Sequence, residues 1–120
     1  NLTANWRLIR SFDPLLRASG TGRAIFVTSG AARGARAYWG AYAVSKAALD
    51  MLVGTYAAEM EKPNVRVNLN DSGATRTAMR ADAYPGEDAL SLKEPDSLTD
   101  AFVALADPAC ERHGELVTTS

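Results

Sequence analysis

The chain has 120 residues, with 13 basic and 14 acidic side chains and a formal net charge of −1. This length is enough for one domain with a buried core, and the balanced charge does not indicate nucleic acid or an anionic membrane as a partner. Charged residues interrupt every long apolar stretch, so we expect no membrane-spanning segment. The single cysteine, Cys110, excludes an internal disulfide and favours a reducing cytoplasm as the compartment.

Residues 1–17 are predicted to form a helix, because apolar side chains recur at helical spacing with arginines between them. A turn at residues 19–22, built from serine, threonine and glycine, ends this helix. Residues 23–29 follow as a strand whose short apolar run is typical of a parallel strand buried on both faces. The apolar residues of the helix are Leu2, Trp6, Ile9, Phe12, Leu15 and Leu16.

Residues 30–40 are predicted to be a loop rich in glycine, alanine and arginine. Gly30 and Gly34 have the spacing of a dinucleotide-binding glycine loop after a strand. The third glycine of that motif is missing, with Arg36 in its place, and no second strand with a terminal acidic residue follows about twenty residues later. We therefore interpret the segment as a glycine-tolerant loop with solvated arginines, Arg33 and Arg36, and keep phosphate binding as the alternative.

Residues 41–62 are predicted to form a long helix, which Lys62, Pro63 and Asn64 end. Small residues near its start allow another backbone or a ligand to approach closely. We expect its apolar face to consist of Val44, Ala48, Met51, Leu52, Thr55 and Tyr56.

Tyr42 and Lys46 are four residues apart near the start of this helix, so they share one face. An ammonium beside a phenol favours the phenolate and lowers the pKa of the tyrosine towards the range of an acid–base catalyst. Ser29 ends the preceding strand, and open α/β sheets bind ligands at that edge. Tyr38 has no lysine four residues after it, so Tyr42 is the better candidate. The alternative is an ordinary amphipathic helix with a surface lysine.

Ser29, Tyr42 and Lys46, within the surrounding Y-A-V-S-K-A-A-L, resemble the active-site segment of the classical short-chain dehydrogenase/reductases. The resemblance covers nearly the whole chain but only the second half of the family's fold, because the T-G-x-x-x-G-x-G cofactor loop of the first half is not in this sequence. It implies an α/β fold, in which a three-layer Rossmann-like parallel sheet is flanked by helices, as the second half of a doubly wound fold. Residues 1–120 would be a single domain, and the start at Asn1 indicates a fragment.

The resemblance also implies hydride transfer between NAD or NADP and a small-molecule carbonyl or alcohol substrate. Tyr42 would be the acid, Ser29 would hold the carbonyl oxygen, and Lys46 would lower the pKa of Tyr42 and bind the nicotinamide ribose. Asn1 would hold a water that relays protons, although an ordinary helix-start asparagine is the alternative. The family's subunits pair through the helices at 1–17 and 41–62, which implies a homo-oligomer. A catalytically inactive fragment or an assembly module is the second hypothesis.

Residues 65–70 are predicted to form a second strand, whose alternating pattern indicates an edge position, whereas the family places it inside the sheet. The turn at 71–77 resembles the family's P-G-x-x-x-T turn, with Ser72 in place of the proline. The resemblance implies that Gly73, Thr75 and Thr77 bind the nicotinamide carboxamide. A helix N-cap is the alternative for Thr77.

Residues 78–95 are polar and correspond to the family's variable substrate lid. A helix is predicted at 97–107, with Ser97 as its cap and Leu98, Phe102 and Leu105 on one face. A last strand is predicted at 114–118. His113 is interpreted as a solvated turn histidine, and since it has no Cys, His or acid at ligand spacing we expect no metal site.

Overall fold

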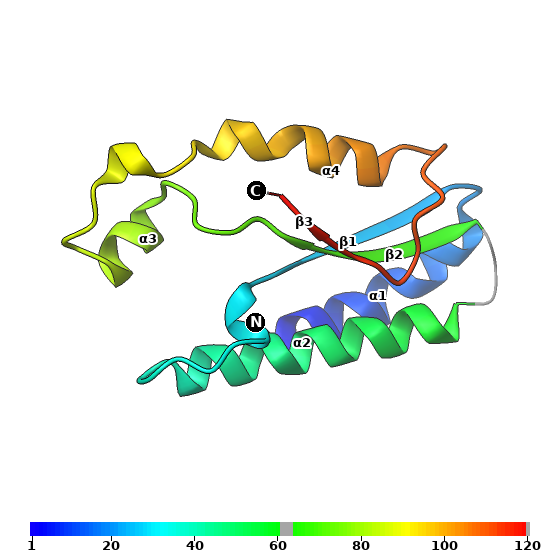
Figure 1. Cartoon of the computed structure of the whole chain (residues 1–120). Coiled ribbons are helices and arrows are strands. Elements are labelled where there is room, and N and C mark those ends of the chain that lie inside the picture. Colours follow the sequence, from blue (N-terminus) through cyan, green and yellow to red (C-terminus); the bar gives the residue numbers. More distant parts are fainter. Residues whose placement is uncertain (61–63, 120) are drawn as a thin grey trace.

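The computed structural model describes residues 1–60 and 64–119, which form a three-stranded sheet with helices on both faces (Figure 1). This arrangement confirms the predicted three-layer α/β architecture. In chain order the elements are α1 (Thr3–Ala18), β1 (Gly22–Thr28), the 3₁₀ turn η1 (Gly30–Ala32), α2 (Gly40–Glu59), β2 (Val65–Asp71), α3 (Ala78–Ala83), the 3₁₀ turns η2 (Ala89–Ser91) and η3 (Pro95–Leu98), α4 (Thr99–Ala106) and β3 (Leu116–Thr118).

The three strands are parallel and lie in the order β1-β2-β3. β1 and β2 pair from Gly22 opposite Val65 to Thr28 opposite Asp71, and the last three residues of β2 pair with β3. The edge position that the sequence pattern indicated for residues 65–70 is therefore wrong, and Val65 and Val67 of this central strand are fully buried. Because parallel strands end at one edge of a sheet, the loops after Thr28 and Asp71 are neighbours.

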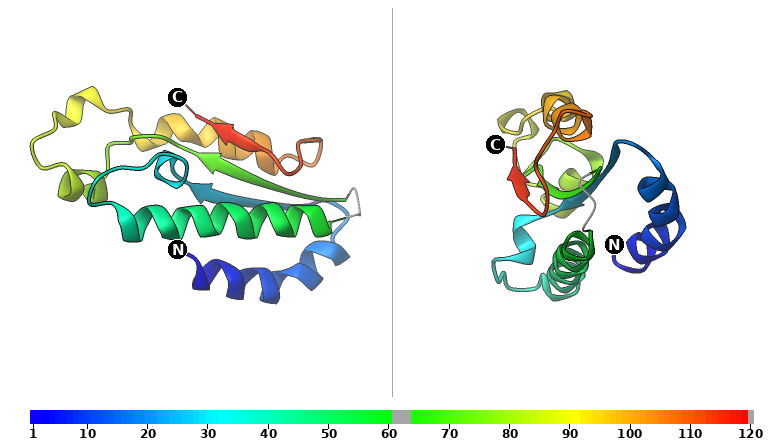
Figure 2. Two further views of the ribbon diagram at one scale, coloured as in Figure 1. Left: turned by 60° about the horizontal axis from the view of Figure 1, so that its bottom comes forward. Right: turned by 90° about the vertical axis from the view of Figure 1, so that its right-hand side faces the viewer.

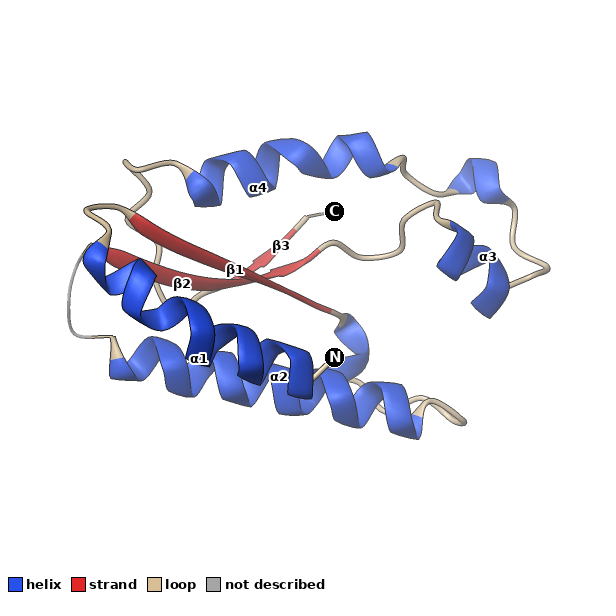
Figure 3. Ribbon diagram, turned by 180° about the vertical axis from the view of Figure 1, so that it is seen from behind, coloured by secondary structure: helices blue, strands red, loops and turns tan. Residues whose placement is uncertain are grey.

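The helices are divided between the two faces of the sheet. α1 and α2 cover one face and α4 covers the other, while α3 lies beyond the carboxyl ends of the strands (Figures 2 and 3). Within residues 1–60 and 64–119, no helix combines the length and the apolar character that crossing a bilayer requires. The two faces are thus covered unequally, by two long helices on one side and one short helix on the other.

The predicted apolar face of α2 is wrong in part, because Val44 and Met51 are 69% and 72% exposed. Apolar residues occur on every side of this helix, so their spacing does not identify the side that is buried. The side chains that α2 buries in the core are Leu49, Val53, Tyr56 and Ala57.

The end of α2 also differs from the prediction, since the helix stops at Glu59 rather than at residue 62. Met60 leaves the helical conformation (φ −87°, ψ 91°), and its side chain is buried in the core. Lys62 and Pro63, the predicted stop signal, lie outside the described residues.

α1 packs on α2 partly through a polar contact. The Tyr56 hydroxyl donates to the Asp13 carboxylate (2.8 Å), which also pairs with Arg17 (2.9 Å). Burial, followed by the bond to Asp13, raises the pKa of Tyr56 above its usual range. Most of the predicted apolar face of this helix remains exposed, and the side chain that it buries is Ile9.

The predicted helix at 97–107 begins later than expected, because residues 95–98 form the 3₁₀ turn η3 before α4 starts at Thr99. Ser97 is not the cap: its hydroxyl donates back to the Glu94 carbonyl (2.7 Å) inside that turn. Pro95 favours a tight first turn by fixing its own φ. Leu105, on the predicted apolar face, is buried as expected.

His113 is not a solvated turn residue. Its Nδ1 accepts a hydrogen bond from the Val67 N–H (3.1 Å), and its Nε2 lies 2.8 Å from the Ala57 carbonyl oxygen. A carbonyl only accepts, so both bonds form together when the ring is neutral with its proton on Nε2. The Gly114 N–H bonds to the Val67 carbonyl (2.7 Å). Val67 of β2 is therefore paired by His113 and Gly114, which precede β3 in the chain, and the imidazole also links the sheet to α2.

Candidate active site

Ser29 directly follows β1 and is the N-cap of η1. Its Oγ accepts a hydrogen bond from the Ala31 N–H (3.2 Å). A hydroxyl has one donor hydrogen and two acceptor lone pairs. The bond from Ala31 therefore orients the oxygen and leaves the O–H hydrogen available to a group at the carboxyl edge of the sheet.

The backbone amides after Ser29 bond within their own turn. The Ala32 N–H bonds to the Ser29 carbonyl (3.0 Å), and the N–H groups of Arg33 and Gly34 bond to the Gly30 carbonyl (3.0 and 3.1 Å). Amides that are paired in this way do not form the open cradle that a phosphate requires. The structure therefore does not support the alternative that Gly30 to Gly34 binds phosphate.

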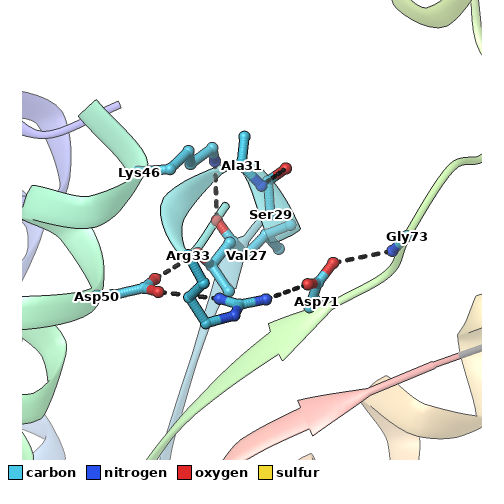
Figure 4. A network of polar contacts seen from close by, with 9 residues as sticks. Val27, Ser29, Ala31, Arg33, Lys46, Asp50, Asp71 and Gly73 are labelled. Carbon is cyan, nitrogen blue, oxygen red and sulfur yellow. Dashed lines mark hydrogen bonds and ion pairs between the residues drawn. The ribbon is translucent and has the colours of Figure 1, made fainter. Parts of the chain in front are cut away.

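Lys46 reaches the end of β1 from α2. Its Nζ donates to the Val27 carbonyl (2.9 Å), two residues before Ser29 (Figure 4). Burial lowers the pKa of Lys46 below its ordinary value of 10.5, and the negative charge of Asp50, one helical turn further on, acts in the opposite direction. The site thus holds a partly desolvated ammonium beside the serine loop.

Tyr42 lies one helical turn before Lys46, in the first turns of α2. Its ring meets Trp39 edge to face (5.8 Å between centroids), and Trp39 in turn contacts the ring of Tyr84 after α3 (5.7 Å). Within the described residues the Tyr42 hydroxyl has no hydrogen-bond partner. Tyr38, the competing phenol, is fully exposed and has a positive φ of 70°, so it is not part of this aromatic row.

Asn1 directly precedes the N-cap of α1, and its side chain reaches the first turns of α2. Its Nδ2 donates to the Ser45 Oγ (3.1 Å), and Ser45 donates to the Tyr42 carbonyl (2.7 Å). The N-cap of α1 is Leu2, with no side-chain bond, so Asn1 stands at the start of this helix without capping it through its side chain. Asn1 is exposed beside the turn of α2 that carries Lys46.

The turn after β2 contains the other predicted residues. Gly73 has a φ of 65°, in the left-handed region that favours glycine, and its N–H bonds to the Asp71 Oδ1 (3.0 Å). Thr75 is buried and donates to the Gly73 carbonyl (3.3 Å). Thr77 accepts from the Arg80 N–H (3.1 Å) as the N-cap of α3, which confirms the capping alternative and leaves its hydroxyl hydrogen free.

Arg33 joins the loop of Ser29 to both neighbouring elements. Its side chain is exposed, as predicted, but it is also ion-paired, which was not predicted from the sequence. Its Nη1 pairs with Asp50 on α2 (3.0 Å) and its Nη2 pairs with Asp71 at the end of β2 (Figure 4). Sequence reasoning missed this group because the partners of Arg33 are 17 and 38 residues away. The position of Asp50, four residues after Lys46 on the same helix face, was the one available signal.

A cavity of about 200 Å³ lies between α3 and the segment after it, with Arg80, Tyr84 and Glu87 in its wall. Ser29, Tyr42 and Lys46 do not line it, so it belongs to the lid region and not to the group of predicted catalytic residues. No cluster of three or more His, Cys, Asp or Glu side chains in residues 1–60 and 64–119 is arranged to hold a metal ion.

Comparison with known proteins identifies the family. The family model described as short chain dehydrogenase matches residues 1–88. The uncharacterized oxidoreductase YciK of Escherichia coli K12 is 40% identical over 105 residues, which are 88% of this chain and 41% of that protein. The chain belongs to the short chain dehydrogenase family.

Two solved structures agree with this assignment. A short chain dehydrogenase from Pseudomonas syringae has a TM-score of 0.92 at 38% identity, over 98% of this chain and 48% of that one. Another, from Escherichia coli CFT073 in complex with NADPH, has a TM-score of 0.91 at 36% identity, over 98% of this chain and 49% of that one. The chain thus spans about half the length of the relatives that it matches.

Proposed function

We propose that the protein is an NAD(P)-dependent oxidoreductase that transfers hydride between a nicotinamide and a small carbonyl or alcohol substrate. One observation carries the proposal: Lys46, partly desolvated, bonds to Val27 at the end of β1 (2.9 Å), beside the free hydroxyl hydrogen of Ser29. Tyr42 lies one helical turn away, with its hydroxyl unpaired within the described residues. Residues 1–120 would be the C-terminal part of an NAD(P)-binding domain.

The three side chains divide the proton chemistry between them. Tyr42 donates the proton that the developing alkoxide needs, and Ser29 donates a hydrogen bond to the same oxygen. Lys46 stabilises the phenolate that remains on Tyr42, because a nearby cation favours the charged form of a phenol. Asn1, next to the same turn of α2, holds the water that returns a proton to Lys46. When bound, the nicotinamide supplies the hydride.

The residues at the edge of the sheet fit the nicotinamide half of the cofactor. The turn after β2 approaches the Ser29 loop, and the carbonyl of the exposed Gly73, which accepts one bond from Thr75, keeps a second lone pair for a carboxamide N–H. Thr77 keeps a free hydroxyl hydrogen and Lys46 presents an ammonium, which suits ribose hydroxyls. NADPH in the related structure from Escherichia coli CFT073 supports the phosphorylated form of the cofactor.

The aromatic row of Trp39, Tyr42 and Tyr84 would form one wall of the substrate site, since it begins at the proposed proton donor and continues into the lid. The substrate would be a small molecule, with neither nucleic acid nor a membrane as partner. A reducing cytoplasm remains the proposed compartment, because the single cysteine, Cys110, is a free thiol.

The experiment is NADPH oxidation with a panel of carbonyl compounds, comparing the wild type with Tyr42→Phe. We expect Tyr42→Phe to lower kcat at least about a hundredfold, the usual contribution of a positioned acid, while the circular dichroism spectrum stays unchanged. Tyr38→Phe is the matched control and should keep its turnover, because Tyr38 is fully exposed and has no lysine one turn later. Near-normal turnover by Tyr42→Phe would contradict the assignment.

The second hypothesis, an assembly module that pairs through residues 1–17 and 41–62, is supported by the apolar surface of α1 and α2. Phe12 and Leu15 are 51% and 64% exposed, and Met51 is 72% exposed. Large exposed apolar patches mark interaction sites. We propose a homo-oligomer through these helices. Sedimentation velocity should show Leu15→Glu shifting to monomer, whereas Leu90→Glu, on the lid, should sediment like the wild type.

A further inference from the structure

A chain of charged contacts connects the two loops at the carboxyl edge of the sheet. Arg33, just after η1, donates to Asp50 on α2 (3.0 Å) and to Asp71 at the end of β2. Asp71 is 6% exposed, so its charge is almost removed from water and requires a partner. Figure 4 shows the guanidinium lying between the two carboxylates.

Each carboxylate also holds a second group. Asp50 accepts a bond from the hydroxyl of Thr28, the last residue of β1, and Asp71 accepts from the Gly73 N–H (3.0 Å). Arg33 therefore lies at the centre of a network that includes the end of β1, the Ser29 loop, α2 and the turn after β2. Charge-assisted hydrogen bonds of this kind are about twice as strong as neutral ones.

The hydrogen bond between Asp71 and Gly73 restricts the turn that follows β2. The turn carries Ser72 where the family's motif has proline, so the unfolded chain has more conformational freedom to lose at this position. In the folded state the Asp71 carboxylate restricts the same turn, because its hydrogen bond fixes the orientation of the Gly73 peptide. Arg33 pairs with the other oxygen of that carboxylate and directs it towards the Ser29 loop.

We infer that Arg33 is a positioning residue that holds the turn 71–77 against the Ser29 loop through Asp71. If the proposed function is correct, on which this step rests, Arg33 fixes the distance between the residues that bind the nicotinamide and those that move the proton. The contacts also argue against Arg33 as a ligand for an anionic substrate, because its Nη1 and Nη2 already pair with Asp50 and Asp71.

The test is amide hydrogen exchange of the ¹⁵N-labelled protein without ligand, read at Gly73. Arg33→Met removes the charge and keeps a long side chain, and we expect it to speed exchange of the Gly73 amide about tenfold. Arg36→Met is the matched control on the same loop and should leave the Gly73 rate unchanged. The rate at Val67, in the core, should stay constant in both variants if they are folded. Equal Gly73 rates in wild type and Arg33→Met would overturn the inference.

A second variant distinguishes a specific effect of Arg33 on the turn at 71–77 from a general loss of stability. Ser72→Pro in the Arg33→Met background restricts the turn without Arg33, so we expect it to restore most of the Gly73 protection. Failure to restore protection while Val67 remains protected would count against the role of Arg33 in fixing the turn.

NADPH fluorescence titration then distinguishes this inference from the proposed function. We expect Arg33→Met to weaken NADPH binding about tenfold and Lys46→Ala to abolish it. If Lys46→Ala abolishes binding but Arg33→Met binds like the wild type, the positioning role is wrong and the proposed function stands. If the wild type binds no NADPH, the proposed function is contradicted for this chain, and the Gly73 rate alone decides whether Arg33 couples the two loops.

Discussion

Replacing His113 with alanine tests whether this side chain stabilises the central strand, β2. The substitution removes the acceptor of the buried Val67 N–H (3.1 Å) and the contact with the Ala57 carbonyl (2.8 Å). A buried donor left without a partner costs about 1–3 kcal/mol, and a lost hydrogen bond about 0.5–1.5 kcal/mol. Because His113 is only partly buried, water can replace some of these contacts, so we expect a loss of about 2 kcal/mol in the free energy of unfolding.

Thermal unfolding followed by circular dichroism measures this loss. For a chain of this size, about 1 kcal/mol corresponds to a shift of about 4 °C in Tm, so His113→Ala should unfold about 8 °C below the wild type. Glu111→Ala is the control, since Glu111 is exposed on the same segment and has no bond within the described residues. A Tm for His113→Ala within about 2 °C of that control would refute the bridging role.

Two further predictions concern the helix packing and the site lysine. Tyr56→Phe should lower the free energy of unfolding by about 1.5–3 kcal/mol in urea, because it removes the bond to the charged Asp13; the exposed Tyr38→Phe should have no effect. Lys46 should titrate below 10.5 by ¹³C NMR, and Asp50→Asn should lower its pKa further, since Asp50 raises it. Because the pKa of Lys46 is lowered in the folded chain, the unfolded chain binds this proton more tightly. The contribution of Lys46 to the free energy of unfolding therefore increases as pH rises from the lowered pKa to 10.5. A measured pKa at or above 10.5 would contradict the burial of Lys46.

Local signals in the sequence predicted the elements of the fold. Glycines bounded the first strand, and the residues that precede and follow it form a helix and a 3₁₀ turn in the structure. The spacing of Tyr42 and Lys46 placed both in the first turns of α2, and Ser29 follows β1 as expected. These predictions succeeded because they depend on residues that are close in sequence.

The errors concern contacts between distant segments. The residues next to His113 in the sequence are typical of a turn, whereas its hydrogen-bond partners, Val67 and Ala57, belong to other elements. Val44 and Met51 were assigned to the buried face because α2 is apolar on several sides, so that only the position of the sheet decides which side packs.

The pairing of Arg33 with Asp50 and Asp71 could not be predicted for the same reason, since the register of β1 and β2 brings these charges together. Of the candidate site, the sequence therefore predicts which residues we propose to carry chemistry, whereas the contacts that hold them in place follow from the tertiary structure.

Titration with NADPH and NADH, followed by nicotinamide fluorescence, tests the central claim most directly. We predict saturable binding by the folded wild type and loss of that binding in Lys46→Ala, because Lys46 presents its ammonium at the carboxyl edge beside Ser29. Saturable binding that Lys46→Ala leaves unchanged would contradict the account of the site. Absence of binding to a folded wild type would contradict the claim that these 120 residues form the nicotinamide half-site.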